Sequence, residues 1–169
     1  INSSIYLSKI HGVEFSPAPH FDLNEEHHLQ QTIIGLIENK LIESAHDISE
    51  GGLLTTLLEK GFTRKLGFEI SSISESGKDG STIRKDAFFF GEGQSRVVVS
   101  VKDKNIANVL RHLEKSEITY AQIGKVTSGS VVVDGENWGD IAKWRELYNT
   151  AIEKHLAKQL ESEGALGMI

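Results

Sequence analysis

The apolar and polar positions of the chain alternate between helical and extended spacing from its first residues. Residues 5–7 predict a strand, and residues 12–23, which hold both prolines, predict an extended connector. A helical face follows in the residues Leu29, Ile33, Leu36 and Ile37. Asp22 or Asn24 is placed to cap this helix, which we expect to end near residues 39–40.

Strands and helices keep alternating toward the middle of the chain. Residues 42–47 predict a short strand, and residues 52–60 predict a second helix. Residues 66–70 alternate apolar and polar side chains like another strand. Residues 71–82 are rich in glycine and serine and predict a polar loop. The run of valines within residues 95–101 predicts a further strand.

The second half of the chain predicts two more helices and a hairpin. One amphipathic helix carries Ile106, Val109, Leu110 and Leu113. Residues 120–126 and 131–133 predict two strands joined by a turn at residues 128–129, and another turn follows at residues 134–135. A last helix carries Ile141, Trp144, Tyr148, Ala151 and Ile152 on one side, and a polar tail spans residues 157–169. This order favours a mixed sheet covered by helices, an α+β fold or α/β sandwich.

Composition narrows the class of protein. The chain has 169 residues, of which 38% are hydrophobic and 25% charged, values typical of one soluble globular domain. The net charge of -6 offers no electrostatic reason to expect nucleic acid or an anionic membrane as a partner. The absence of cysteine excludes disulfides, thiolate metal sites and a cysteine nucleophile. Because the chain begins with Ile1 and shows no signal-peptide pattern, we expect a piece of a longer polypeptide.

One short segment packs a histidine, two carboxylates, two hydroxyls and a double glycine where a predicted strand meets a predicted helix. Asp47 ends the strand, where ligands usually meet α/β sheets, and a carboxylate there can bind Mg²⁺. His46 can act as a base or a hydrogen-bond donor. The simpler interpretation is that Asp47 or Ser49 caps the helix while Gly51 and Gly52 permit a tight turn. Spacing alone leaves both interpretations open.

A second polar segment follows three consecutive phenylalanines. Glu92 and Gln94 lie two residues apart, so in an extended backbone they point the same way and can grip a ligand together. Gly91 and Gly93, which flank Glu92, allow a ligand to approach the backbone closely. Arg96 can pair with a phosphate or with Glu92. The alternative is a bulge or turn that contains a structural arginine–glutamate pair.

The position of His46 beside Asp47 and the absence of several common motifs exclude other kinds of site. His46 and Asp47 are adjacent on a predicted strand, so they should point to opposite faces and form no catalytic dyad. The sequence contains no P-loop, dinucleotide-binding fingerprint, HExxH or GxSxG motif.

Both polar segments carry a family resemblance. Residues 46–53, followed by an apolar helix, resemble the His-Asp-x-Ser-(Asp/Glu)-Gly-Gly-Leu motif of the aminoimidazole ribonucleotide synthetase superfamily. Residues 89–97 resemble the second signature of that superfamily, in which Glu-Ser-Gln is usual and Gly93 here replaces the serine. Residues 4–12 and 17–23 further resemble the branch that makes formylglycinamidine ribonucleotide. Since two motifs occur in the family's order and separation, the chain is identified as a member over about residues 3–155.

The resemblance implies the fold of the synthetase C-terminal domain and a place in the second of two tandem halves. Residues 24–156 would form this domain, residues 1–23 a remnant of the linker from an upstream N-domain, and residues 157–169 a tail. The implied reaction is a cytoplasmic, ATP-dependent ligation in purine biosynthesis. It joins formylglycinamide ribonucleotide to ammonia released from glutamine. The implied partners are the upstream synthetase domains, a glutaminase subunit and a small bridging subunit, with ATP or ADP and Mg²⁺ as cofactors.

The resemblance also implies that the site in this half is auxiliary, and that the isolated chain is inactive and holds no catalytic residue. The candidate ligand-binding residues are His46, Asp47, Ser49, Gly51, Gly52, Glu92, Gly93, Gln94 and Arg96, with Asp47 the candidate metal ligand. One alternative is the C-domain of another superfamily member: aminoimidazole ribonucleotide synthetase, selenophosphate synthetase or thiamine-phosphate kinase. Another is a scaffold module that binds no ligand.

Overall fold

A computed structural model describes the backbone of residues 1–72 and 83–166, and side chains as far as residue 160. Most of the loop predicted at residues 71–82 lies outside the described residues. The helices are α1 Ile5–Ile10, α2 Leu23–Glu38, α3 Gly52–Phe62, α4 Lys85–Phe90, α5 Ile106–Lys115 and α6 Ile141–Leu166, with a short 3-10 turn at Asp103–Asn105. The strands are β1 Ser44–Asp47, β2 Gly67–Ile70, β3 Val97–Ser100, β4 Gly124–Thr127, β5 Ser130–Val133 and β6 Glu136–Asp140.

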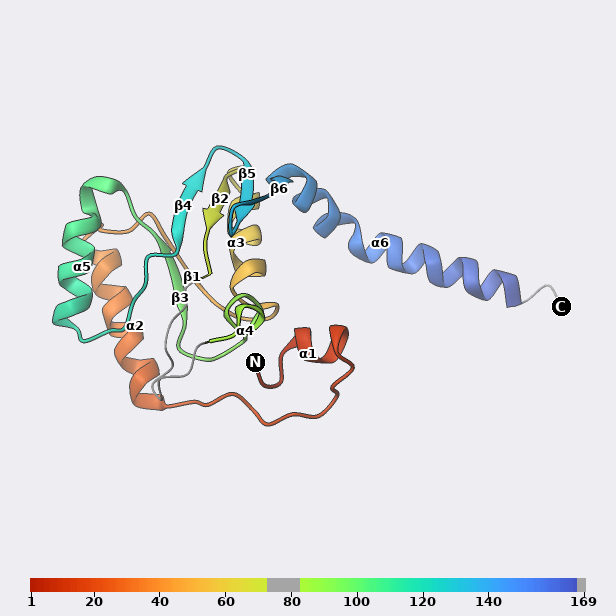
Figure 1. Ribbon diagram of the computed structural model, residues 1–169, viewed down its shortest axis with the longest axis horizontal. Helices are drawn as coiled ribbons and strands as arrows, with labels where there is room; N and C mark the ends of the chain where they lie inside the picture. The colour runs from red at the N-terminus through yellow and green to blue at the C-terminus, as the bar shows by residue number, and fades with distance from the viewer. Residues whose placement is uncertain (73–82, 167–169) are drawn as a thin grey trace.

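The strands form two sheets. The larger sheet combines parallel and antiparallel pairs and is covered by helices, which confirms the predicted mixed sheet. A four-stranded sheet has the order β4-β2-β5-β6, in which β2 runs antiparallel to β4 and parallel to β5. A separate pair joins β1 to β3 in antiparallel register. Helices α2 and α5 lie together on one side of the molecule, and α6 extends away from the body on the other (Figure 1).

The predicted hairpin between β4 and β5 is wrong, because β2 lies between these two strands. The turn at residues 128–129 passes over the end of β2 at Gly67. A Cβ atom at Gly67 would lie 2.1 Å from the carbonyl oxygen of Ser130, so only glycine admits this crossing. The central strand β2, which buries Phe68 and Ile70, gains a hydrogen-bonded neighbour on each side. The turn predicted at residues 134–135 is confirmed, with positive φ at Asp134 and Gly135.

The first predicted strand is also wrong, since residues 5–7 begin helix α1. The hydroxyl of Ser4 caps this helix by accepting a hydrogen bond from the Leu7 amide at 3.3 Å. The sequence pattern missed the short elements α4 and β6, whose length is too small to establish a period. Residues 157–166, predicted as a polar tail, continue helix α6.

Helix α2 confirms the prediction of its position and of its cap. The Asp22 carboxylate accepts hydrogen bonds from the amides of Asn24 at 2.8 Å and Glu25 at 3.1 Å. The predicted apolar face is only partly right. Leu36 is fully buried against α5, whereas Ile37 is 54% exposed. The facing helix α5 covers a narrower stripe than the spacing of apolar residues suggested.

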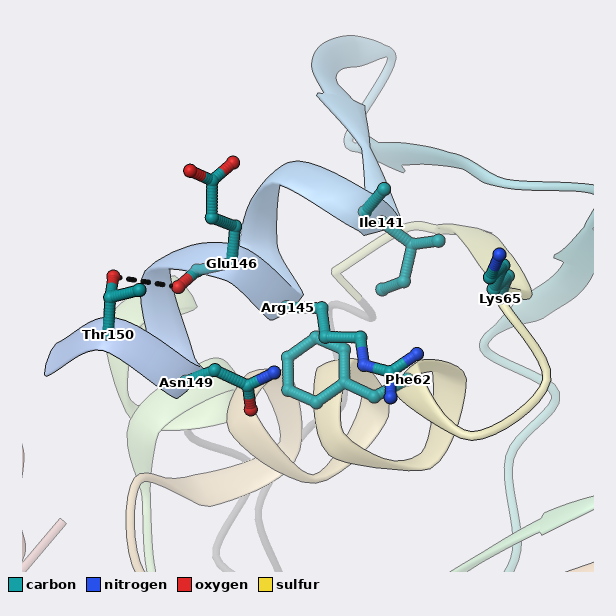
Figure 2. A pocket seen from close by; sticks show the side chains of 8 residues that line it. Phe62, Lys65, Ile141, Arg145, Glu146, Asn149 and Thr150 are labelled. Carbon is teal, nitrogen blue, oxygen red and sulfur yellow. Dashed lines mark hydrogen bonds between the residues drawn. The ribbon is translucent and has the colours of Figure 1, made fainter.

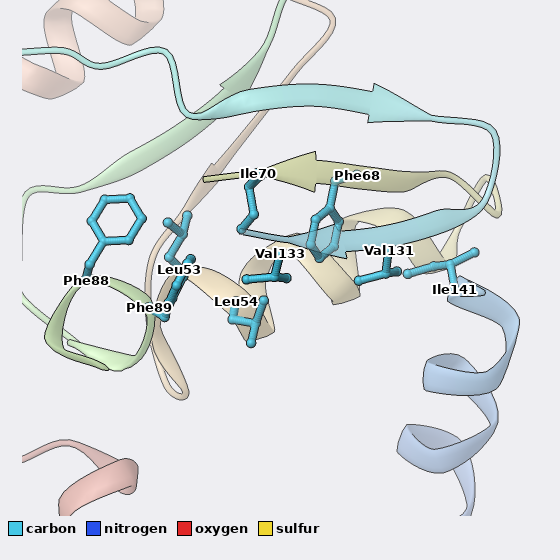
Figure 3. Close-up of a cluster of buried hydrophobic side chains, with 9 residues drawn as sticks. All are labelled: Leu53, Leu54, Phe68, Ile70, Phe88, Phe89, Val131, Val133 and Ile141. Carbon is cyan, nitrogen blue, oxygen red and sulfur yellow. The ribbon is translucent and has the colours of Figure 1, made fainter. Parts of the chain in front are cut away.

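The main hydrophobic core lies between the four-stranded sheet and helices α3 and α4 (Figure 3). Its buried members are Leu53, Leu54, Phe68, Ile70, Phe88, Phe89, Val131, Val133 and Ile141. A smaller cluster of Leu36, Val109 and Leu113 joins α2 to α5. Because α3 and α4 pack on the same core, the segments that precede α3 and follow α4 are held close together.

Lys60 links helix α3 to the two-stranded sheet. Its ammonium group donates a hydrogen bond to the carbonyl oxygen of Val98 in β3 at 3.1 Å. Burial disfavours the charged form and lowers the pKa of Lys60 from 10.5 to about 8. The unfolded chain therefore binds more protons than the folded chain between these two values, and folding becomes more favourable as pH rises through that window.

We expect the wild-type chain to become more stable relative to the Lys60→Met variant as pH rises from about 8 to about 10.5. The quantity compared is the free energy of unfolding of the two proteins. The partial exposure of the ammonium group limits the gain to about 1–2 kcal/mol. Urea unfolding at several pH values measures it. Lys104 is exposed before α5, so Lys104→Met is the matched control and should follow the wild-type profile. Parallel profiles for wild type and Lys60→Met would contradict the assignment.

Candidate functional site

The two polar segments singled out in the sequence lie side by side. Strand β1 pairs with β3 so that Asp47 stands opposite Val97, and the Ile48 amide donates to the Arg96 carbonyl at 2.9 Å. Between them lies a cleft of about 380 Å³. It is lined by Ser3, Pro19, Glu26, Leu29, Asp47, Ile48, Ser49, Glu50, Glu92, Gln94, Ser95, Arg96 and Val97.

Glu92 joins the two segments directly. Its Oε1 atom accepts a hydrogen bond from the Gly51 amide at 2.9 Å and another from the Ile5 amide at 2.9 Å. Gly51 is the N-cap residue of α3 and has no side chain to cap the helix. A carboxylate at this end complements the partial positive charge of the helix. Glu92 therefore takes the capping role that the sequence offered to Asp47 or Ser49.

The double glycine is required by the backbone, as the simpler interpretation predicted. Gly51 and Gly52 have φ values of +81° and +72°, a region that side chains disfavour. A Cβ atom at Gly52 would lie 2.7 Å from the carbonyl oxygen of Phe89 and 2.7 Å from Cα of Phe90. Helix α3 thus starts directly against the end of α4.

His46 and Asp47 lie closer to each other than strand alternation predicts. The side chain of Asp47 is 77% exposed and lines the cleft. The Nδ1 atom of His46 lies 2.7 Å from the Asp47 carbonyl oxygen and 3.6 Å from its carboxylate. The imidazole ring turns toward the following residue and contacts the main chain of Asp47.

Within the second segment, Arg96 is hydrogen-bonded to the main chain, whereas Gln94 is exposed. The Arg96 guanidinium donates to the carbonyl oxygens of Gly91 at 3.0 Å and Phe88 at 3.5 Å, which secures the end of α4. Gln94 is exposed at the cleft. Gly93 has no strained φ, and an added Cβ would meet only Arg96 Cδ at 3.8 Å, so the serine usual in the family would fit.

The structure adds Glu26, Ser3 and Pro19 to the cleft, and the sequence analysis had not placed any of them in a site. Ser95 donates a hydrogen bond to the Glu26 carboxylate at 2.8 Å, which brings helix α2 to the cleft. Hydrogen bonds from Gln30 and Ser95 lower the pKa of Glu26. Ser3 and Pro19 arrive from the N-terminal segment. These residues come from parts of the chain distant in sequence, so spacing could not group them.

The cleft offers little of its own to a metal ion. Among the side chains of residues 1–72 and 83–160, no group of three or more histidines or carboxylates is placed to hold one. Asp47 and Glu50 present exposed carboxylates, whereas Glu92 is engaged by two amides. This donor set fits Mg²⁺ only where phosphate oxygens and water complete its coordination.

A second hollow, of about 360 Å³, lies between the end of α3 and helix α6 (Figure 2). It is lined by Phe62, Lys65, Ile141, Ala142, Arg145, Glu146, Asn149 and Thr150. None of the residues predicted for a site lies there.

Within the described part of the chain, no helix has both the length and the apolar character needed to cross a membrane.

Comparison with known proteins supports the resemblance read from the two motifs. The family model for the C-terminal domain of AIR synthase related proteins matches residues 1–135. This chain belongs to that family. The matched region contains both polar segments and the whole cleft.

The family includes long enzymes that resemble this chain over a fraction of their length. The chain is 39% identical over 163 residues to the phosphoribosylformylglycinamidine synthase subunit PurL of Chlorobaculum tepidum, covering 92% of this chain and 21% of that subunit. It is 34% identical to the same subunit of Alkaliphilus metalliredigens, covering 90% and 21%. The chain therefore spans about a fifth of the length of the curated relatives it matches.

Solved structures share the fold. Thermotoga maritima PurL, solved in complex with FGAR, superposes with a TM-score of 0.63 at 17% identity, covering 77% of this chain and 22% of that one. A protein of Thermus thermophilus gives a TM-score of 0.51 at 19% identity, covering 80% and 42%.

The need for glycine at position 52 gives a test on the site itself. We expect Gly52→Ala to lower the free energy of unfolding by about 2–3 kcal/mol, because it combines a strained φ with a clash against α4. Gly93→Ser is the matched control and should change stability by less than about 0.5 kcal/mol. Urea denaturation measures both. Equal stability of the two variants would contradict the close approach of α3 to α4.

Proposed function

We propose that this chain is the C-terminal domain of the second half of a formylglycinamidine ribonucleotide synthase. The observation that carries the proposal is its identity of 39% over 163 residues with a synthase subunit about five times as long. The reaction would be the ATP-dependent conversion of formylglycinamide ribonucleotide and ammonia into formylglycinamidine ribonucleotide. It would take place in the cytoplasm as a step of purine biosynthesis.

In this proposal the chemistry occurs outside the chain. ATP would activate the amide oxygen of the substrate as a phosphate or an equivalent intermediate, and ammonia would displace it. Mg²⁺ would neutralise the phosphate charges. The partners would be the upstream synthetase domains, a glutaminase subunit that releases ammonia, and a small bridging subunit. Solved Thermotoga maritima structures named as complexes of PurL with ATP and with ADP, and as PurLQS, support these assignments.

We further propose that the cleft is the auxiliary, pseudo-symmetric site of this half. Asp47 would bind a phosphate-bound Mg²⁺. The polar groups of His46, Ser49, Gln94 and Arg96 would surround the bound ligand. The exposed Asp47 carboxylate supports this assignment. Glu92 and the glycines 51, 52 and 93 would shape the site, since the Glu92 carboxylate already accepts two amides.

A domain exchange tests the enzyme assignment. We expect the Chlorobaculum tepidum synthase subunit to keep ammonia-dependent activity when this chain replaces its matching segment. Activity should stay within about tenfold of the parent, a change worth about 1.4 kcal/mol. The isolated chain should show none. The matching segment of the Alkaliphilus metalliredigens relative serves as the control. An active control alongside an inactive exchange would contradict the proposal.

Titration with Mg²⁺-ADP tests the auxiliary site. We expect the chain to bind the complex and Asp47→Asn to weaken binding by about ten- to a hundredfold, because loss of an interaction with a charged group costs about 1.5–3 kcal/mol. Glu43→Gln, at the opposite end of β1, is the control and should bind like wild type. Calorimetry measures all three. Equal affinity of wild type and Asp47→Asn would favour the scaffold alternative.

A further inference from the structure

The first 22 residues fold back on themselves and form one wall of the cleft. The hydroxyl of Ser3 donates to the carbonyl oxygens of Ser16 at 2.9 Å and Pro17 at 3.0 Å, which closes this segment into a loop. We call residues 1–22 the N-terminal strap. Ser3 and Pro19 of the strap line the cleft together with residues of the two polar segments.

The strap is docked onto the domain at α1. The Ile5 amide, at the start of α1, donates to Glu92 Oε1 at 2.9 Å. One residue later, the ring of Tyr6 stacks on Phe90, with centroids 4.8 Å apart and an interplanar angle of 4°. Both partners belong to the end of α4 and the loop after it, so α1 rests on the second polar segment.

The same carboxylate oxygen also holds the start of α3. Glu92 Oε1 accepts the Gly51 amide at 2.9 Å, in addition to the Ile5 amide. A carboxylate oxygen has two lone pairs, and these two donors use both. A ligand group that hydrogen-bonds to this oxygen, or a ligand oxygen that takes the Gly51 amide, must displace one of the existing bonds.

We propose that Glu92 is a positioning residue that latches the N-terminal strap to the first polar segment. Together with the Tyr6–Phe90 stack, this latch holds the strap against the cleft. Occupation of the cleft at Glu92 or at the Gly51 amide is thereby coupled to the position of α1. This holds whichever ligand the cleft takes, because it depends only on the two amides that share one oxygen.

Hydrogen–deuterium exchange on the 169-residue chain tests the latch. We expect Glu92→Ala to speed exchange by about tenfold or more in peptides covering α1 and the start of α3, since both lose a charge-assisted hydrogen bond. Glu92→Gln keeps an oxygen acceptor and should give a smaller rise, of about two- to fivefold, in the same two peptides. Peptides from β5 should exchange like wild type in both variants.

Glu50→Ala is the matched control, because Glu50 is an exposed carboxylate that lines the same cleft next to Gly51. It should leave all three regions unchanged. If Glu92→Ala loosens the whole domain, the milder Glu92→Gln decides the question. The proposal is overturned if α1 exchanges like wild type in Glu92→Ala, or if β5 rises as much as α1 in Glu92→Gln.

Discussion

The carboxylate of Glu92 accepts two main-chain amides with one oxygen, and the arrangement of the cleft depends on it. One amide begins helix α3 and the other begins α1, so three segments far apart in the sequence meet at a single charged group. A negative charge suits both positions, because helix starts leave N–H groups without partners. This interaction explains why a glycine can stand at the N-cap of α3 without a side-chain cap.

The interaction is possible only because the backbone approaches itself closely. Gly52 lets α3 start against the end of α4, and Gly67 lets the turn after β4 cross the end of β2. Both glycines border the main core, in which α3, α4 and the sheet bury their apolar faces together. The core holds the two polar segments in place, and the β1–β3 pairing sets the register between them.

Several polar groups of the cleft are engaged in hydrogen bonds within the chain. Two of its glutamates, Glu26 and Glu92, accept hydrogen bonds within the chain, and the Arg96 guanidinium donates to main-chain carbonyls. Asp47 and Glu50 are left as exposed carboxylates. The chain spans about a fifth of the length of its relatives, and in the proposed function other domains complete the chemistry.

The sequence alone determined the family, the α+β class and the position of both polar segments, and it narrowed the cap of α2 to Asp22 or Asn24. Each of these follows from local spacing or from a contiguous motif. Only the tertiary structure decided that β2 separates β4 from β5, that residues 5–7 are helical, and that Glu92 rather than Asp47 or Ser49 caps α3. The physical reason is the same in each case. Strand order, the docking of α1 on Phe90 and the Glu92 hydrogen bonds are contacts between residues far apart in the chain, whose pairing no local pattern encodes.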